Sequence, residues 1–197
     1  TELELFSDIF ERVKEFSPPR FCDDEEILNP MNWKDWIQMI ISDNFLAVSD
    51  RLTFRHLSES DASELYLSWF EDKEVKKFIL GAEEFRNKKK LVSYINGHNL
   101  NPNSILIGIF EKNEHIGNIK YEPINFDKKV ATLGILIGKE ENRGRGFGPE
   151  IIKTTTAILF KEFQINRFNL GVNENNIAAI RAYEKIGFKK LKKIEKS

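Results

Sequence analysis

The stretch ATLGILIGKEENRGRGFGPEIIKTTTAIL, residues 131–159, contains a strand, a glycine-rich turn and the start of a helix in immediate succession. Apolar residues alternate with others from Ala131 to Ile137, which is typical of a strand, and helical periodicity starts at Ile151. Glycines allow the backbone to approach an anion closely, and the first amides of a helix have no internal partner. The stretch therefore predicts a turn that binds phosphate.

The type of turn narrows the ligand. A Walker loop ends in Gly-Lys-Ser/Thr, whereas residues 146–149 are Gly-Phe-Gly-Pro. A dinucleotide fingerprint belongs to a first strand-helix unit, and this turn lies late in the chain. The pattern Arg143-x-x-Gly146-x-Gly148 instead resembles the pyrophosphate loop of the GNAT superfamily, the acetyl-CoA-dependent N-acetyltransferases.

A second motif downstream strengthens this resemblance. Residues 176–188, NIAAIRAYEKIGF, match the family pattern Asn-x-x-Ala-x-x-x-Tyr-x-x-x-Gly-Phe on its last full helix. The spacing has its own physical meaning, because Asn176 suits a helix N-cap and Gly187 a helix end. Ala179 and Tyr183 lie four residues apart and share one helix face.

The resemblance covers residues 51–193 and implies an α/β (α+β) fold, in which a mixed, mostly antiparallel central sheet is flanked by helices. It also implies acetyl-CoA as acetyl donor. Tyr183 matches the residue that protonates the departing thiolate, and Asn176 one that contacts the cofactor arm, while Lys185 is expected within reach of a phosphate. The remaining expected cofactor-binding residues are Leu136, Ile137 and Gly138, along which the pantetheine arm would pair, and the turn residues Arg143, Gly144, Arg145, Gly146, Phe147 and Gly148.

The general base is the weakest part of the match. Many relatives place Glu on the fourth strand, and the matching residue here is Thr132, which is not a base at neutral pH. Glu122 on the preceding strand is the candidate catalytic base, with His115 behind it. The alternative is that both are strand residues without a catalytic role and that water removes the proton.

The acceptor is expected to be a small-molecule amine. By resemblance, the region around residues 58–94 forms much of the acceptor wall, so Trp69, Phe70 and Phe78 are candidate substrate contacts, with core packing as the alternative for each. Two sequence segments, residues 68–75 and 115–125, resemble those of the branch that contains ribosomal-protein and amino-sugar acetyltransferases. We therefore expect an amino sugar, a sugar nucleotide or a similar metabolite. The alternatives are a protein N-terminus and a non-catalytic acyl-CoA-binding module.

Composition gives no support to several other classes of protein. The 197 residues carry a net charge of −1 with 31% charged and 41% hydrophobic residues, which gives no indication of nucleic-acid binding. A single cysteine, Cys22, and three scattered histidines predict neither a disulfide nor a metal site. Since no apolar run approaches eighteen residues, we expect no membrane span and a cytoplasmic location.

The two ends depart from the family pattern. Residues 1–46 are predicted to form a helical extension, with helices over residues 2–16 and 30–41, before an acetyltransferase domain at residues 47–197. Relatives continue about thirty residues past Gly-Phe, whereas nine residues follow Phe188 here. We expect the sheet edge at residues 188–194 to be covered, either by a second subunit in a homodimer or by the helical pair.

Overall fold

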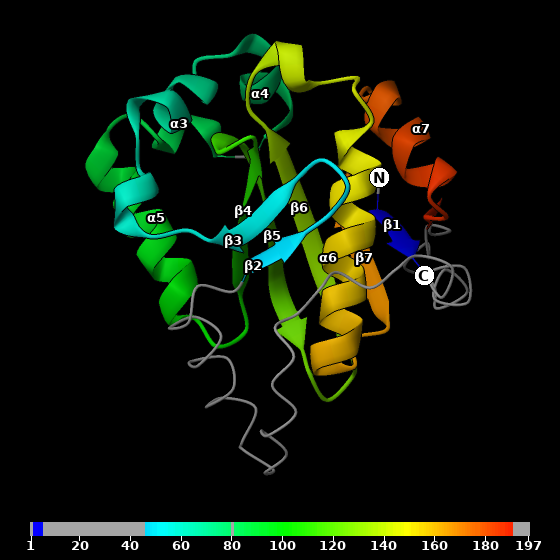
Figure 1. The fold of residues 1–197 in the computed structure, drawn as a ribbon. Helices are drawn as coiled ribbons and strands as arrows, with labels where there is room; N and C mark the ends of the chain where they lie inside the picture. The colour runs from blue at the N-terminus through cyan, green and yellow to red at the C-terminus, as the bar shows by residue number, and fades with distance from the viewer. Residues whose placement is uncertain (1, 6–45, 80, 191–197) are drawn as a thin grey trace, which may run out of the picture.

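The computed structural model describes residues 2–5, 46–79 and 81–190, and these form one mixed sheet with helices on both faces (Figure 1). Neighbouring strands are antiparallel except β6 and β7, which are parallel. This confirms the expected fold class. In spatial order the strands are β2 (Leu46–Val48), β3 (Thr53–His56), β4 (Ile105–Glu111), β5 (Glu114–Asn125), β6 (Val130–Ile137), β7 (Arg167–Gly171), β1 (Glu2–Leu5) and β8 (Lys189–Lys190).

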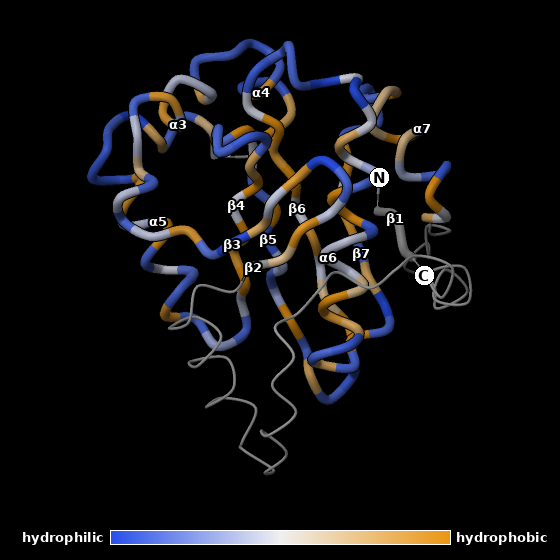
Figure 2. The backbone as a smooth tube through the Cα atoms, viewed as in Figure 1, coloured by the Kyte–Doolittle hydropathy of each residue, from blue (hydrophilic) through white to orange (hydrophobic). Residues whose placement is uncertain are grey.

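Strands β4, β5 and β6 form an antiparallel meander. The β4–β5 turn places Lys112 and Asn113 at φ of 47° and 70°, the left-handed pair that a two-residue hairpin requires. In the β5–β6 turn, the side-chain oxygen of Asn125 accepts a hydrogen bond from the Lys128 amide at 2.8 Å. Figure 2 shows that the central strands are mostly hydrophobic and the connecting turns mostly hydrophilic.

One face of the sheet is covered by α6 (Phe147–Phe163), which makes the crossover from β6 to the parallel strand β7. The helix buries Ile151, Ile152, Ile158 and Leu159 in a core shared with the strands. Thr155 on the same face hydrogen-bonds the Tyr121 hydroxyl of β5 at 2.8 Å. The other face is covered by a second core from α3 (Glu64–Trp69), α4 (Lys73–Phe78), α5 (Lys88–Leu100) and the short turns η1 (Glu59–Asp61) and η2 (Ala82–Glu84).

The sequence predicts one helix from residue 58 to residue 70, but the structure has η1 followed by α3. Ser63 interrupts the helix because it acts as a second N-cap, accepting a hydrogen bond from the Tyr66 amide at 3.2 Å. Downstream, α7 (Ile177–Lys185) begins as predicted, since the Asn176 side chain accepts from the Ala179 amide.

The helix predicted over residues 2–16 is wrong at its start. Residues 2–5 form strand β1, which pairs antiparallel with β7 on one side and with β8 on the other. The physical reason is visible in the sequence: Glu-Leu-Glu-Leu alternates with period two, and β7 and β8 offer unpaired backbone groups. The rest of that helix and the one at residues 30–41 lie outside the described residues.

Strand β1 covers one side of the sheet edge expected after Phe188. Lys189 and Lys190 pair with Glu4 and Leu3, so an N-terminal strand of the same chain lies between β7 and β8. Among the described residues, β8 is the last strand on this side of the sheet. Residues 191–194 lie outside the described part, and the homodimer stays a prediction.

An ion pair ties η1 to the sheet and gives a testable pH dependence. The Arg55 guanidinium contacts both carboxylate oxygens of Asp61, at 2.6 and 2.8 Å, and lies over the Phe110 ring. Burial alone would raise the pKa of Asp61, but hydrogen bonds from Arg55 and Ser58 outweigh it and hold that pKa below its usual range.

We expect Asp61→Asn to lower the free energy of unfolding by about 2–3 kcal/mol at pH 7, because Arg55 loses its charged partner. A carboxylate with a depressed pKa stabilises the fold above its unfolded pKa of about 3.9 and loses that contribution as the pH falls through the folded value. The deficit should therefore shrink at pH 3. Urea titrations at both pH values, with the exposed Asp127→Asn as control, measure it; an equal deficit at both would contradict the ion-pair explanation.

Candidate functional site

The site lies where β6 and β7 separate. The two strands pair in parallel over residues 130–133 and 167–170, and β6 then continues to Ile137 with β5 on only one of its edges. A cavity of about 470 Å³ opens at this separation, a size typical of small-molecule sites. Gly134, Ile135 and Leu136 line it from β6, and Gly171, Val172 and Asn173 from the end of β7.

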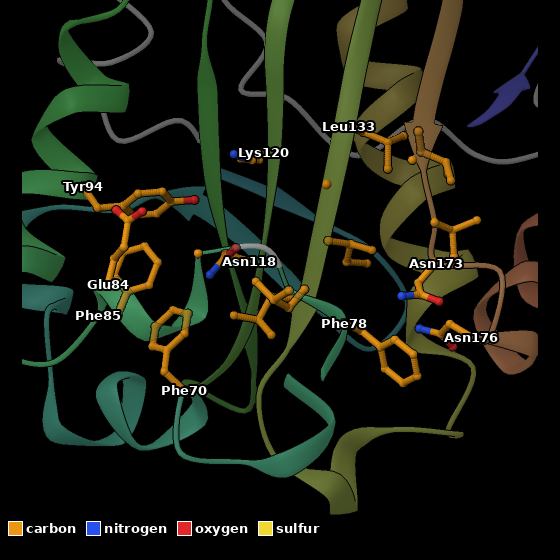
Figure 3. A pocket seen from close by; sticks show the side chains of 18 of the residues that line it. Phe70, Phe78, Glu84, Phe85, Tyr94, Asn118, Lys120, Leu133, Asn173 and Asn176 are labelled. Atoms are coloured by element: carbon orange, nitrogen blue, oxygen red, sulfur yellow. The ribbon is translucent and has the colours of Figure 1, made fainter. Parts of the chain in front are cut away.

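The cavity has two ends, seen in Figure 3. Asn173, Asn176 and Phe78 lie at one end, beside β7 and α7, and we call this the β7 end. Across the floor formed by Asn118 and Lys120, the opposite end is walled by Phe70, Glu84, Phe85 and Tyr94, and we call this the aromatic end. The rings of Phe70 and Phe85 stack with centroids 4.2 Å apart, and Tyr94 meets Phe85 edge-on.

The glycine turn before α6 has the geometry of an anion site. Gly144 and Gly146 adopt φ of 72° and 80°, which only glycine adopts at little cost, and Gly146 is the N-cap of α6. The first four amide positions of a helix lack an internal acceptor, and Pro149 has no N–H. The amides of Gly146, Phe147 and Gly148 are therefore left to bind a ligand. A Cβ on Gly148 would meet no described atom within 4 Å, so the backbone there is open to a close approach.

Both arginines of the turn have protein partners. Arg143 donates to the carbonyl oxygens of Ile137 and Gly138 and contacts Asp72 at 3.1 Å. Arg145 pairs with both carboxylate oxygens of Glu111, at 2.6 and 2.7 Å. These contacts stabilise the conformation of the turn. Because carboxylates already pair with both arginines, their positive charge is only partly available to a bound phosphate.

A second set of contacts supports the turn from the β2–β3 loop, and no motif in the sequence indicates it. Arg51 contacts Glu150 at 2.6 Å and donates to the Arg145 carbonyl oxygen at 2.9 Å. The guanidinium groups of Arg51 and Arg145 both lie over the buried Phe147 ring, at 4.5 and 4.4 Å from its centroid. The Phe147 side chain is thus part of the core, and only its backbone is placed to bind a ligand.

Tyr183 lines the cavity from α7, with its ring packed near Phe188 at a centroid distance of 5.9 Å. Burial raises the pKa of Tyr183 to about 12, so the phenol keeps its proton at neutral pH. Its hydroxyl makes no hydrogen bond to a residue that the structure describes, which leaves the proton available to a ligand. Asn176 lines the same end, although its side-chain oxygen is engaged as the α7 cap.

Neither candidate base lines the cavity. Glu122 lies two residues beyond Lys120 on β5. One of its carboxylate oxygens accepts a hydrogen bond from Asn101 at 2.8 Å, and the other lies 3.8 Å from the Lys120 ammonium. His115 is buried against Tyr66 and Trp69, and burial lowers its pKa to about 4. Catalysis of proton removal by Glu122 stays a prediction, and His115 is placed in the core.

The predicted acceptor contacts separate into two groups. Phe70 and Phe78 line the cavity, at opposite ends. Trp69 does not, because it is 1% exposed and packs directly beneath Gly138, where a Cβ would lie 2.2 Å from its ring. Trp69 therefore packs in the core, which is the alternative stated for it in the sequence analysis.

Other predicted cofactor residues lie outside the cavity. Leu136 lines it, but Ile137 and Gly138 do not, since the Gly138 amide donates to the Ile116 carbonyl oxygen. Lys185 also lies outside its lining. The sequence analysis did not identify Glu84, Phe85, Tyr94, Asn118, Lys120 and Asn173. Asn118 and Lys120 had a usable signal, because they are polar residues that alternate with Ile119 and Tyr121 along the strand.

Among the described residues, no group of three or more His, Cys, Asp or Glu side chains is arranged to hold a metal ion. No helix within those same ranges is both long and apolar enough to cross a bilayer.

Together these features suit an extended ligand with an anionic end. Free amides at the start of α6 can hold phosphate, the unpaired edge of β6 can bond an amide-containing arm, and Tyr183 can donate a proton at the β7 end. The residues present therefore fit the acetyl-CoA that the sequence motifs imply.

Comparisons with known proteins agree. The sequence profile of the Acetyltransferase (GNAT) domain matches residues 51–189. The N-acetyltransferase 9-like protein of Caenorhabditis briggsae is 24% identical over 139 residues, covering 65% of this chain and 70% of the relative. A solved structure of Microcin C7 self immunity acetyltransferase MccE, in complex with acetyl-CoA and AMP, superposes with a TM-score of 0.66 at 18% identity, covering 76% of this chain and 84% of that one.

A second solved structure has a similar fold. RimL, a ribosomal L7/L12 alpha-N-protein acetyltransferase in complex with coenzyme A, superposes with a TM-score of 0.65 at 17% identity. The match covers 71% of this chain and 81% of RimL. At such identities the two structures establish a common fold.

Proposed function

The chain belongs to the GNAT acetyltransferase family, and from that membership we propose that it acetylates the primary amine of a small polar metabolite, such as an amino sugar or a sugar nucleotide. The observation that carries the proposal is the cavity at the separation of β6 and β7, which has Tyr183 and Asn176 at its β7 end and a distinct aromatic end. Acetyl-CoA, when bound, supplies the acetyl group as a thioester.

The residues of this chain then have separate tasks. The free amides at residues 146–148 bind the pyrophosphate, and the unpaired edge of β6 at residues 134–136 aligns the pantetheine arm. The amine nitrogen forms the new C–N bond while the C–S bond breaks. Tyr183 gives its proton to the departing sulfur.

Removal of the proton from the acceptor ammonium is assigned to solvent in the cavity. Among the described lining residues Glu84 is the sole carboxylate, and it stands at the aromatic end, where it can hold an ammonium group against Phe85 and Tyr94. Glu122 is outside the lining and already accepts a hydrogen bond from Asn101.

A protein N-terminus is the second candidate acceptor, supported by the fold shared with RimL. A peptide needs an open groove for the residues that follow its first one. The stacked pair of Phe70 and Phe85 and the turn η2 wall the aromatic end instead, and this wall favours a compact acceptor.

A panel of amines with coenzyme A release as the readout tests the proposed function. We expect turnover with at least one amino sugar or sugar nucleotide and a kcat/KM at least about tenfold lower for peptides that begin with serine, alanine or methionine. Boiled protein and reactions without amine are the controls. Faster turnover of the peptides would favour the second candidate, and no turnover of any amine by protein that binds acetyl-CoA would contradict both.

A further inference from the structure

Lys120 lines the cavity from β5. It lies between Asn118 and Glu122, and Asn118 and Lys120 both line the cavity floor. Lys120 is the cross-strand partner of Gly134 on β6, and a Cβ there would lie in ordinary van der Waals contact with the Lys120 side chain, 3.5 Å from its Cε and 3.6 Å from its Cγ. The stem of Lys120 therefore lies beside a glycine that also lines the cavity.

The ammonium group of Lys120 is incompletely paired. Its ion-pair partner within the described residues is Glu122, with 3.8 Å between the Lys120 nitrogen and the nearest carboxylate oxygen. That distance exceeds a hydrogen bond, and the Glu122 carboxylate is shared with Asn101 at 2.8 Å and His98 at 3.7 Å. Since an ammonium has three donors and 40% of the Lys120 side chain is exposed, it retains donors for a ligand.

A cation is unexpected beside a substrate that is itself an amine. Lys120 is the sole Lys or Arg among the described cavity residues, and its charge would repel the ammonium form of an acceptor. An anionic group on the acceptor removes this conflict, because it would take up the free donors of Lys120 while Glu84 at the aromatic end takes up positive charge.

We propose that Lys120 determines acceptor specificity by binding an anionic group, a phosphate or a carboxylate, carried by the amine substrate. The inference rests on the proposed function and names the class of acceptor more closely. It assigns Lys120 to substrate binding, with Glu122 and His98 as the groups that position it from behind.

Pairs of acceptors with and without the anion test this, each compared at the same concentration of free amine. Glucosamine and glucosamine 6-phosphate form the phosphate pair, and glycinamide and glycine the carboxylate pair. We expect wild-type protein to prefer the anionic member of one pair by about 10- to 100-fold in kcat/KM, the range of one charge-assisted contact. Lys120→Gln should bring that ratio close to one, mainly through KM, Lys120→Arg should keep it, and Lys120→Glu should reverse it.

Two controls keep the result specific. Lys128→Gln removes an exposed lysine from the β5–β6 turn, and the anion preference should survive there. The pH dependence of kcat/KM for glucosamine separates a second explanation, in which Lys120 only lowers the pKa of the acceptor amine. In that case Lys120→Gln would shift the pH profile and leave the anion ratio unchanged, which would overturn the proposal.

Calorimetric binding of the same acceptors to the protein saturated with coenzyme A distinguishes failure of this inference from failure of the proposed function. Turnover of neutral amines without any anion preference would refute the inference and keep the function. No turnover, combined with Lys120-dependent binding of glucosamine 6-phosphate, would refute the function and keep the inference. Equal binding of both members of each pair to the wild type would overturn it directly.

Discussion

Gly146→Val is expected to weaken acetyl-CoA binding by more than about 100-fold. A valine side chain at the N-cap of α6 would keep a pyrophosphate away from the free amides, and loss of two charge-assisted hydrogen bonds removes roughly 3 kcal/mol or more. Gly146 also has φ of 80°, where a β-branched residue is strained by about 1–3 kcal/mol. The variant should therefore lose some stability as well as affinity.

Gly148→Val separates the two effects. Gly148 lies inside α6 without a positive φ, and a Cβ there would meet nothing within 4 Å, so this variant should fold as well as the wild type and still lose binding. Gly97→Ala on α5, also without neighbours within 4 Å, is the matched control and should keep its affinity. Titration calorimetry with acetyl-CoA, beside thermal denaturation, gives both quantities. Wild-type affinity in folded Gly146→Val and Gly148→Val proteins would refute the pyrophosphate assignment.

Elements that local chemistry specifies were predictable from the sequence. The glycines at 144 and 146 and the Asn176 cap each act within a few residues, and the structure has the turn and α7 where they indicate. The same holds for β6 and α6, whose periodicities of two and 3.6 are long enough to be distinct.

The N-terminal strand was not predictable in the same way. Residues 2–16 contain apolar residues at helical spacing, and that longer pattern outweighed the four alternating residues at its start. What favours a strand at residues 2–5 is the unpaired edge offered by β7 and β8, which lie more than 160 residues away. Helix and strand propensities describe local preferences and contain no information about a pairing strand so far away in the sequence.

The candidate site was predictable on its donor side and much less on its acceptor side. Motif residues Tyr183 and Asn176 line one cavity because they belong to one helix and its N-cap, and the Gly146 turn is specified by its own glycines. Glu84 and Tyr94 meet at the aromatic end only because α5 packs across β4, a tertiary contact without a local signal. Trp69 illustrates the converse: an aromatic residue beside the site becomes core because Gly138 leaves room for its ring.

Tyr183→Phe is the variant that tests the chemistry itself. The substitution keeps the ring that packs near Phe188 and removes only the hydroxyl, so acetyl-CoA affinity should hold within about threefold. Loss of a general acid typically lowers turnover by about 100- to 10,000-fold, and we expect a fall of that size in kcat. Since the pKa of Tyr183 is raised to about 12, the phenol is the proton-bearing form throughout pH 6–9, and its ionisation should limit wild-type activity only in strongly alkaline solution.

The defect should also depend on the leaving group. A thioester whose thiol has a low pKa releases a stable thiolate that needs less protonation, so the ratio of wild-type to Tyr183→Phe turnover should fall with such a donor. Tyr121→Phe is the control, because it removes a buried phenol that bonds Thr155 and does not line the cavity, and its turnover should stay near that of the wild type. Stopped-flow measurement of thiol release with both donors gives these ratios. If Tyr183→Phe turns over normally with every acceptor and donor that the wild type uses, Tyr183 packs in the core without giving a proton, and solvent must protonate the thiolate instead.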